Sequence, residues 1–517
     1  MNSIIYGGVI NTMDPKNKNA EAVVFNDEEI LFVGNLEEAK KNFEAENEIN
    51  LDGKTLFPGF TDTHCHLSFT GEMLTLPNVF EIDNIKDVLN FFAEEAKKLD
   101  KDSALLVNGF GGVLIKEKRL PTLEEMDKAV PDHVLICKTA GTHETLVNSQ
   151  ALKLIEKVAK EENIPVAKED MQTGILRNEA NLLAFSLSSR LMNEDQRKNS
   201  MQKVIDECVK NGIVAAHTLE GKDLKNDSDV YSFLKLKDEL PFDARIYYQT
   251  TNVEEVLGLG LKQIGGCFKC LLDGDVDPGT AAMRKPYTNN PKNSGTLYFT
   301  QEKLNEFFKK ANRAGLQICM HAIGDAAIEQ ALNAYEYALN DYPRNDHRHR
   351  IEHFEIGDYD LIERAKNMGI LLAMQPVFDY YWPYETYVPY LGEERAKKRC
   401  MLRDALDSGI KVGGGSDSPV TPMNPFLSIH EAVNHSVESS RITLDEALKM
   451  HTSDAAYLGF QENIRGSIEK GKRPDFAIVS ENPYEVSKEN LDKIKVLATI
   501  FGGKVVWSSE SLNGKLK

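Results

Sequence analysis

The chain has 517 residues, of which 41% are hydrophobic and 8% aromatic, so it is long enough for a large core or for a main domain with a smaller companion. Its 61 lysines and arginines against 80 aspartates and glutamates give a formal charge of -19, which argues against nucleic acid or an anionic membrane as a partner. We expect an enzyme-sized globular protein.

The cysteines and the first residues bear on the cellular compartment. Seven cysteines scattered over a long chain do not make a disulfide framework, which fits a reducing compartment. The start from Met1 to Gly8 lacks the basic segment and apolar core of a signal peptide, and no later apolar run approaches a membrane span. We therefore expect a cytoplasmic protein.

The two ends of the chain share a pattern of short strands. Residues 1–57 show alternating apolar and polar positions separated by turns. The tail from about residue 463 is similar, with a strand from Phe476 to Val479 and a hairpin from Ile500 to Val506. Residues 1–57 and 455–517 are therefore predicted to form one small composite β-sandwich domain.

The middle of the chain, residues 58–454, alternates short apolar runs with helical patterns such as Glu302 to Arg313 and Ala326 to Ala338. This alternation is typical of βα units, and eight parallel strands would close a (β/α)8 TIM barrel. The eight candidate strands lie at about 60–66, 213–217, 245–250, 266–272, 317–321, 349–353, 370–375 and 411–415.

Two further strand-like runs do not fit the barrel. They extend from Ala104 to Asn108 and from Val134 to Thr139, between the first and second barrel strands. We assign residues 70–205 to an insertion within the barrel domain.

The first barrel strand ends in a pattern that is typical of a metal site. Side chains two apart on a strand point to the same face, so His64 and His66 present two imidazoles from one rigid element. That arrangement suits a divalent metal, and Cys65 points the other way. A single H-x-H is a weak signal, because either histidine could belong to the core or the surface.

Other polar residues end or enter the later strands. Active sites in this fold form at the carboxyl ends of the barrel strands, so these residues are expected to converge on one rim. They are His217 on strand two, Lys269 within strand four, His321 on strand five, His353 on strand six and Asp417 on strand eight. Near Lys269, Cys267 and Cys270 form a C-x-x-C without a second pair, and we interpret both as buried thiols.

These pieces, in this order, resemble the metal-dependent amidohydrolases, and more narrowly the amidohydrolase-3 branch of YtcJ-like hydrolases. The resemblance extends over almost the whole chain. Its specific segments are Pro58 to His66, Phe268 to Gly274, His321 to Asp325, Arg350 to His353 and Gly415 to Pro419.

The resemblance implies a site with one or two divalent ions, with zinc expected and manganese or iron as alternatives. His64, His66, His321 and His353 would bind metal. Lys269 would bridge two ions as a carbamate formed with carbon dioxide, because a carboxylated lysine offers two anionic oxygens. Alternatively, Lys269 is a plain lysine paired with Asp273 or Asp275, and His321 and His353 are core histidines.

The chemistry implied is attack of a metal-activated water on a carbonyl. Asp417 is the candidate catalytic acid and base that takes the water's proton and passes it to a leaving nitrogen. A helix cap or turn is the alternative role for Asp417. His217 is the second catalytic candidate, because it could polarise the substrate carbonyl. Alternatively, it supports the metal ligands without contacting the substrate.

Three residues are candidates for substrate binding. His143 and Arg177 lie in segments that resemble insertion motifs of this branch, so both are candidate substrate-binding residues, with helix caps and packing as the alternative. Trp382 is the third candidate, because the aromatic run from Phe378 to Tyr384 follows strand seven and could cover the pocket. A packed surface helix would explain that run as well.

We therefore predict a hydrolase of non-peptide carbon–nitrogen bonds that acts on a small-molecule amide. The main alternative is a deaminase of a heterocyclic amine with a single metal. A catalytically silent metal-binding protein is a remote one, because Asp417 is present. Gly53-Lys54-Thr55 lacks the upstream glycine of a P-loop, and Ser416 lies in no G-x-S-x-G motif, so nucleotide binding and serine hydrolysis are not supported. From the resemblance alone, a homodimer is plausible.

Overall fold

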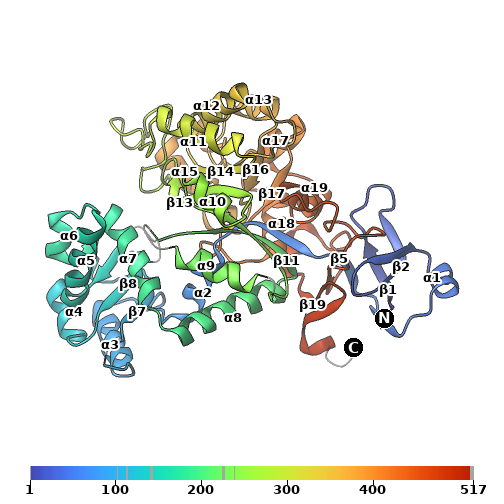
Figure 1. Ribbon diagram of the computed structural model, residues 1–517, viewed down its shortest axis with the longest axis horizontal. Coiled ribbons are helices and arrows are strands. Elements are labelled where there is room, and N and C mark those ends of the chain that lie inside the picture. The colour runs from blue at the N-terminus through green and yellow to red at the C-terminus, as the bar shows by residue number, and fades with distance from the viewer. Residues whose placement is uncertain are drawn as a thin grey trace. The chain divides into compact units, whose positions relative to one another are not determined.

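The computed structural model describes residues 2–101, 103–111, 115–139, 144–223, 227–237 and 239–512. The chain divides into two compact units. Unit 1 comprises Met1–Leu67, Ile205–Glu220 and Lys235–Lys517, and unit 2 comprises Ser68–Val204 and Gly221–Leu234. Figure 1 follows the chain through both units by colour.

The core of unit 1 is a sheet of eight parallel strands. Consecutive strands along the chain are neighbours in this sheet, as in a barrel of βα units. Its strands are β6 (Phe60–Cys65), β11 (Ile213–Glu220), β12 (Asp243–Tyr248), β13 (Gln263–Leu271), β14 (Gln317–Ala322), β15 (Arg350–His353), β16 (Leu371–Met374) and β17 (Val412–Gly414).

Hydrogen bonds between the first strand and the segment after the last one join the two edges of this sheet. The Asp417 amide donates to the His64 carbonyl at 2.7 Å, and the His66 amide donates to the Ser418 carbonyl at 2.9 Å. The predicted (β/α)8 barrel is confirmed, with its strands close to the expected positions.

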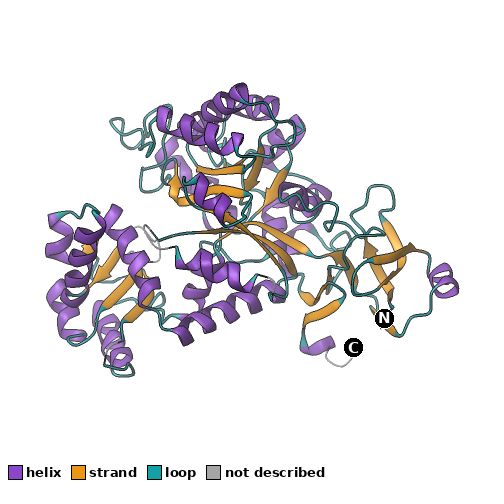
Figure 2. Cartoon of the chain, viewed as in Figure 1, coloured by secondary structure: helices purple, strands orange, loops and turns teal. Residues whose placement is uncertain are grey.

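Helices surround the barrel strands, as the purple and orange elements of Figure 2 show. The two helices predicted from their pattern are α11 (Gln301–Arg313) and α12 (Asp325–Asp341). The others of the barrel are α10 (Val253–Gly258), α13 (Tyr359–Met368), α14 (Phe378–Tyr381), α15 (Tyr384–Leu391), α16 (Glu393–Ala396), α17 (Leu402–Ser408), α18 (Pro425–Asn434), η1 (Glu438–Ser440), α19 (Leu444–Met450) and α20 (Ser453–Leu458).

Strands from the two ends of the chain pair in a second sheet of unit 1. The N-terminal and C-terminal strands meet where β5 (Thr55–Pro58) pairs with β18 (Phe476–Val479) in antiparallel register. The other members are β1 (Ser3–Asn11), β2 (Asn19–Phe25), β3 (Ile30–Gly34), β4 (Asn47–Asn50), β19 (Val496–Phe501) and β20 (Lys504–Ser508), accompanied by α1 (Leu36–Asn42), η2 (Lys488–Lys493) and η3 (Glu510–Leu512).

This second sheet is continuous, and its two faces bury separate apolar clusters. Ile5 and Val23 contribute to one cluster, whereas Ile4 and Val24 contribute to the other. Side chains alternate between the faces of a strand, so neighbouring residues belong to opposite cores. The helix α1 was not predicted, although the Asn35 side chain caps it by accepting from the Glu37 amide.

Unit 2 has its own sheet, in the order β10 (Ile175–Leu176), β9 (Thr145–Val147), β8 (Leu135–Thr139) and β7 (Leu105–Phe110). The runs noted at 104–108 and 134–139 are therefore strands outside the barrel. The second segment of this unit, Gly221–Leu234, lies beyond the predicted insertion of 70–205.

The helices of unit 2 are α2 (Leu67–Thr75), α3 (Ile85–Ala96), α4 (Leu123–Ala129), α5 (Ser149–Glu162), α6 (Lys168–Thr173) and α7 (Asn178–Leu191). The boundaries between the two units fall within α2, α8 (Glu194–Lys210) and α9 (Ser228–Leu236).

Two further sequence expectations concern thiols and membranes. All seven cysteines are buried free thiols, as the absence of a disulfide framework predicted. Among the described residues, none of the helices combines the length and the apolar character that crossing a membrane requires.

Candidate metal centre

The strand-one histidines His64 and His66 are buried at the end of β6. His64 Nδ1 lies 2.5 Å from Glu352 Oε2, and His66 Nδ1 lies 3.0 Å from the Leu219 carbonyl oxygen. Because a carbonyl oxygen only accepts, His66 Nδ1 carries a proton. The Glu352 carboxylate is also an acceptor, so His64 Nδ1 carries a proton as well. The Nε2 atom of each ring is thereby turned towards Asp417, whose Oδ1 lies 3.1 Å from both.

His321 and His353 form a second pair on the neighbouring strands β14 and β15. Their ring centroids lie 4.5 Å apart. His353 Nδ1 contacts Gln375 Oε1 at 2.8 Å, and His321 Nε2 lies 3.5 Å from Asp273 Oδ1. The Gln375 oxygen therefore holds one nitrogen of His353 from outside, in the way that outer partners orient metal-binding imidazoles, whereas the buried His321 Nε2 has no hydrogen-bond partner among the described residues.

Asp417 has a backbone that holds it in place after β17. Its φ of 54° lies in the left-handed region, which is sparsely populated for residues other than glycine and which tends to occur at functional sites. Burial alone would raise the pKa of the Asp417 carboxyl, but the His64 and His66 imidazoles hold that pKa well below its usual range. Asp417 is therefore an anion in this site.

These side chains fit a divalent cation, because lone pairs and negative charge face one another. Neutral imidazoles whose Nδ1 donates outward present an acceptor at Nε2, and an acceptor beside the Asp417 carboxylate needs a proton or a metal between them. The same demand raises the pKa of His66 to about 10, despite the opposing effect of burial, through Asp417 and Cys267. We call His64, His66, His321, His353, Asp417 and Cys267 the ligand group.

The strand-four member of this group differs from the sequence expectation. The Cys267 Sγ atom lies 3.6 Å from His64 Nε2. Lys269 is half-buried, and its Nζ lies 5.7 Å from the centroid of the Tyr248 ring. Among the histidine, cysteine and carboxylate side chains that the structure describes, the thiol of Cys267 is the strand-four group that lies within a cluster able to hold a metal, and the bridging role of Lys269 stays a prediction.

His217 does not close its strand as expected. The strand β11 continues to Glu220, and the His217 side chain is fully buried. Arg350 donates to His217 Nδ1 at 3.0 Å, and a side chain built at Gly459 would lie 2.4 Å from its Nε2. Burial and the charge of Arg350 lower the pKa of His217 well below its ordinary value. This environment fits an indirect role better than contact with substrate.

Arg350 links His217 to the ligand group. Its guanidinium donates to both oxygens of Glu352, at 2.5 and 3.1 Å, and Glu352 in turn contacts His64. The Arg350–Glu352 pair is completely buried. Three charged or polar side chains thus fix the orientation of one imidazole of the ligand group.

The three predicted substrate-binding residues lie in different places. His143 lies outside the described residues. Arg177 is in unit 2, where its guanidinium contacts Glu144 at 2.6 Å and remains partly exposed. Trp382 is in unit 1, and its ring packs edge-on against Phe378 at 5.6 Å, while Phe378 stacks on His353 at 6.2 Å. The aromatic run therefore reaches the ligand group through Phe378.

Glu352 and Gln375, which position His64 and His353, were not predicted from the sequence, and neither was Asp273, which lies 3.5 Å from His321 Nε2. Asp273 accepts backbone N–H groups from Ala282, Ile323 and Gly324 at 2.8 to 3.0 Å. Burial raises the pKa of its carboxyl to about 6. The D-G of the strand-four segment was the available signal for Asp273, whereas nothing in the sequence marks Gln375.

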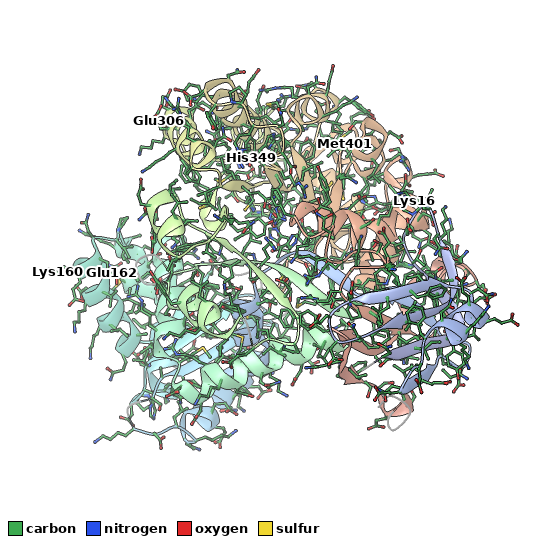
Figure 3. All side chains as sticks on the ribbon, turned by 45° about the vertical axis from the view of Figure 1, so that its right-hand side comes forward. Lys16, Lys160, Glu162, Glu306, His349 and Met401 are labelled. Atoms are coloured by element: carbon green, nitrogen blue, oxygen red, sulfur yellow. The ribbon has the colours of Figure 1, made fainter. Side chains whose placement is uncertain are left out.

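Not every buried histidine of the barrel belongs to this group. His349, labelled in Figure 3, accepts from the Ile318 amide at 3.0 Å through Nδ1 and contacts Asn312 Oδ1 at 3.1 Å through Nε2. Both of its nitrogens have protein partners, so it is a core histidine.

A parallel barrel with imidazoles and a carboxylate at the ends of its strands defines a metal-dependent hydrolase. A crystal structure of an uncharacterized metal-dependent hydrolase from Pyrococcus furiosus has this fold, with a TM-score of 0.76, 25% identity, and coverage of 94% of this chain and 100% of that one. The chain belongs to the Amidohydrolase family, whose model matches residues 47–507.

Two relatives resemble the chain over nearly its full length. The putative amidohydrolase YtcJ of Bacillus subtilis is 28% identical, covering 98% of this chain and 99% of that protein. The N-substituted formamide deformylase of Arthrobacter pascens is 23% identical, covering 97% of each. The predicted family is therefore confirmed.

Proposed function

We propose that the protein hydrolyses a non-peptide carbon–nitrogen bond in a small-molecule amide, with zinc as the bound ion. The observation that carries this proposal is the inward-facing set of acceptors, since His66 Nε2 and His64 Nε2 both lie 3.1 Å from Asp417 Oδ1. Such a set binds a cation, and imidazole nitrogens are ligands that suit zinc. A relative named as an N-substituted formamide deformylase supports an amide as the bond class.

The proposed roles follow from the positions of the side chains. A divalent ion in this site supplies Lewis acidity towards a carbonyl oxygen and makes water more acidic. His64, His66, His321 and His353 hold that ion. Asp417 takes a proton from the attacking water and delivers it to the leaving nitrogen. The hydroxyl joins the carbonyl carbon, the carbon–nitrogen bond breaks, and the products are a carboxylic acid and an amine.

The surroundings of Asp417 support its role in proton transfer. Its main-chain amide donates to the His64 carbonyl at 2.7 Å, and its Oδ1 lies 3.1 Å from both His64 Nε2 and His66 Nε2. The carboxylate therefore lies beside the proposed ligands, where a water on the ion would be within its reach. Phe378, stacked on His353, and Trp382 beyond it are proposed to form an apolar wall for the substituent on the substrate nitrogen.

A substrate panel tests this proposal. The zinc-loaded protein is incubated with N-substituted formamides, longer acyl amides and cyclic amides, and amine and acid products are quantified. We expect equal amounts of amine and acid from at least one amide class. Ammonia release from heterocyclic amines, with all amides left intact, would contradict the proposal and favour a deaminase.

A further inference from the structure

The imidazole of His353 is held by the turn that follows the neighbouring strand β16. Gln375 Oε1 lies 2.8 Å from His353 Nδ1, and the Phe378 ring stacks on the imidazole with a centroid distance of 6.2 Å and an interplanar angle of 19°. The Phe378 amide donates to the Gln375 carbonyl at 3.1 Å, so both side chains belong to one turn. We call Gln375–Asp379 the strand-seven turn. The orientation of His353 depends on where this turn lies.

Asp379, the last residue of the strand-seven turn, anchors the turn to other parts of the barrel. Its side chain is buried, and its amide donates to the Pro376 carbonyl at 3.0 Å within the turn. Its carboxylate accepts from the guanidinium of Arg399, and from the amide and the hydroxyl of Ser436 at 2.5 and 2.6 Å. The backbone that carries the two partners of His353 is therefore tied down through one carboxylate.

Arg399 joins the strand-seven turn to the segment that follows the neighbouring strand β15. Its side chain is only 1% exposed, and its Cζ lies 4.8 Å from the centroid of the Tyr387 ring. Arg399 forms an antiparallel bridge with Ile356, and its Nε lies 3.8 Å from Glu355 Oε1. One guanidinium thus contacts the segments after two barrel strands. Its loss would leave the Asp379 carboxylate buried without its cation, which is strongly unfavourable.

We propose that Arg399 is a positioning residue for the metal centre, which acts through Asp379 and the strand-seven turn to hold the His353 imidazole. This inference rests on the proposed metal-dependent function. A guanidinium suits the task because it is planar, permanently charged and offers several donors in a fixed arrangement. When Arg399 is lost, the turn and the Gln375 oxygen are free to shift. Outer partners of this kind change metal affinity by roughly 10–100-fold.

The zinc affinity of full-length variants, measured by competition with a chromophoric chelator, tests this role. Arg399→Met should weaken zinc binding by roughly 10–100-fold, and Arg399→Lys, which keeps the charge, should recover part of the loss. Arg465→Met is the matched control. Arg465 is equally buried in an ion pair with Asp475, and it contacts Asp243 at the first residue of β12, at the opposite end of the barrel strands. Equal affinity in Arg399→Met and wild type, or equal losses in Arg399→Met and Arg465→Met, would overturn the inference.

A double variant shows whether Arg399 acts through the strand-seven turn. If it does, Gln375→Met combined with Arg399→Met should lose no more zinc affinity than the more severe single variant, because the two side chains act as one unit. Losses that multiply would mean that the two residues act independently, and would overturn the proposed route.

Asp379→Asn serves where Arg399→Met does not fold, because it keeps the shape of the side chain and removes only its charge. We expect weaker zinc binding than in wild type, and unchanged affinity would overturn the inference. The wild-type protein separates the inference from the proposed function. Wild type that binds zinc, with the same affinity as the Arg399 and Asp379 variants, contradicts the positioning role alone, whereas wild type that binds no zinc contradicts both.

Discussion

The ligand group of unit 1 and a charged cluster in unit 2 are both buried, yet they are satisfied in opposite ways. In unit 2, Glu72 accepts from Lys222 Nζ at 2.5 Å, from Lys138 Nζ at 3.1 Å and from Ser189 Oγ at 2.8 Å. Phe69 lies under both ammonium groups, at 5.2 and 5.3 Å. Every charge in this cluster has a partner from the chain.

In the ligand group, by contrast, imidazole nitrogens and a carboxylate need a proton or a metal between them. His66 Nε2 meets the Asp417 carboxylate at 3.1 Å while its Nδ1 is already bonded to a carbonyl. Burying lone pairs and charge in this way is costly unless a cation joins them. The comparison teaches that burial of polar side chains does not by itself indicate a site, whereas the direction of donors and acceptors does.

Replacing the catalytic candidate should give the largest effect. Asp417→Asn keeps the shape of the side chain but removes its charge and its ability to take a proton. We expect the turnover of an amide substrate to fall by roughly 10²–10⁴-fold, the range for loss of a general acid and base. Steady-state kinetics on metal-loaded protein measures this. Asp325→Asn, at an equally buried aspartate, is the control, and equal losses in the two variants would contradict the assignment.

Breaking the unit 2 cluster should affect stability and leave the metal in place. Glu72→Gln leaves two buried lysines without their carboxylate, and removal of one partner from a buried ion pair costs about 3–5 kcal/mol of unfolding free energy. Urea unfolding followed by fluorescence measures it. Glu94→Gln, in an exposed pair with Lys97, should cause no measurable change. A loss of bound metal in Glu72→Gln would mean that the two regions are not independent.

The same cluster should make stability depend on acid pH. Burial would raise the pKa of Glu72, but Lys222 and Lys138 lower it to about 2, from an ordinary value of 4.5. Its contribution is therefore fully present above pH 4.5 and is lost as the pH falls towards 2. The difference in unfolding free energy between wild type and Glu72→Gln should shrink by roughly 3 kcal/mol over that window. A difference that stays constant would contradict the assigned pairing.

Loosening the orientation of one ligand should have the smallest effect. Gln375→Met removes the oxygen that holds His353 Nδ1 at 2.8 Å. Outer partners of this kind change metal affinity by roughly 10–100-fold when lost. Competition with a chromophoric chelator gives the dissociation constant. The control is Gln330→Met. Gln330 is a buried glutamine of α12 that donates to the Phe299 carbonyl, so its loss should leave the metal affinity unchanged.

Much of the barrel could be predicted from the sequence, because strand and helix patterns are local. The end of β6 and the histidines His321 and His353 follow from apolar runs that end in imidazoles. The side chain of strand four that faces the histidines could not be predicted in this way. A bulge depends on the backbone torsions of Gly265 and Phe268, and a shift of register changes which side chain faces inward.

Residues that act across the sheet were also beyond the sequence. Gln375 contacts His353 from the end of the neighbouring strand β16, and Glu352 on β15 contacts His64 on β6, which is not a neighbour of β15 in the sheet. No spacing along the chain encodes those contacts. His217 was misplaced because β11 continues three residues further than its apolar run predicted. The segment Gly221–Leu234 joins unit 2 through contacts that are distant in sequence.

Metal analysis of two histidine variants tests the central claim most directly. His353 and His349 are both buried beside β15, but only His353 belongs to the ligand group. Wild type purified without chelator should contain about one to two ions per chain, His349→Asn should retain them, and His353→Asn should lose at least one. A wild-type protein without metal, or equal metal content in both variants, would contradict the account.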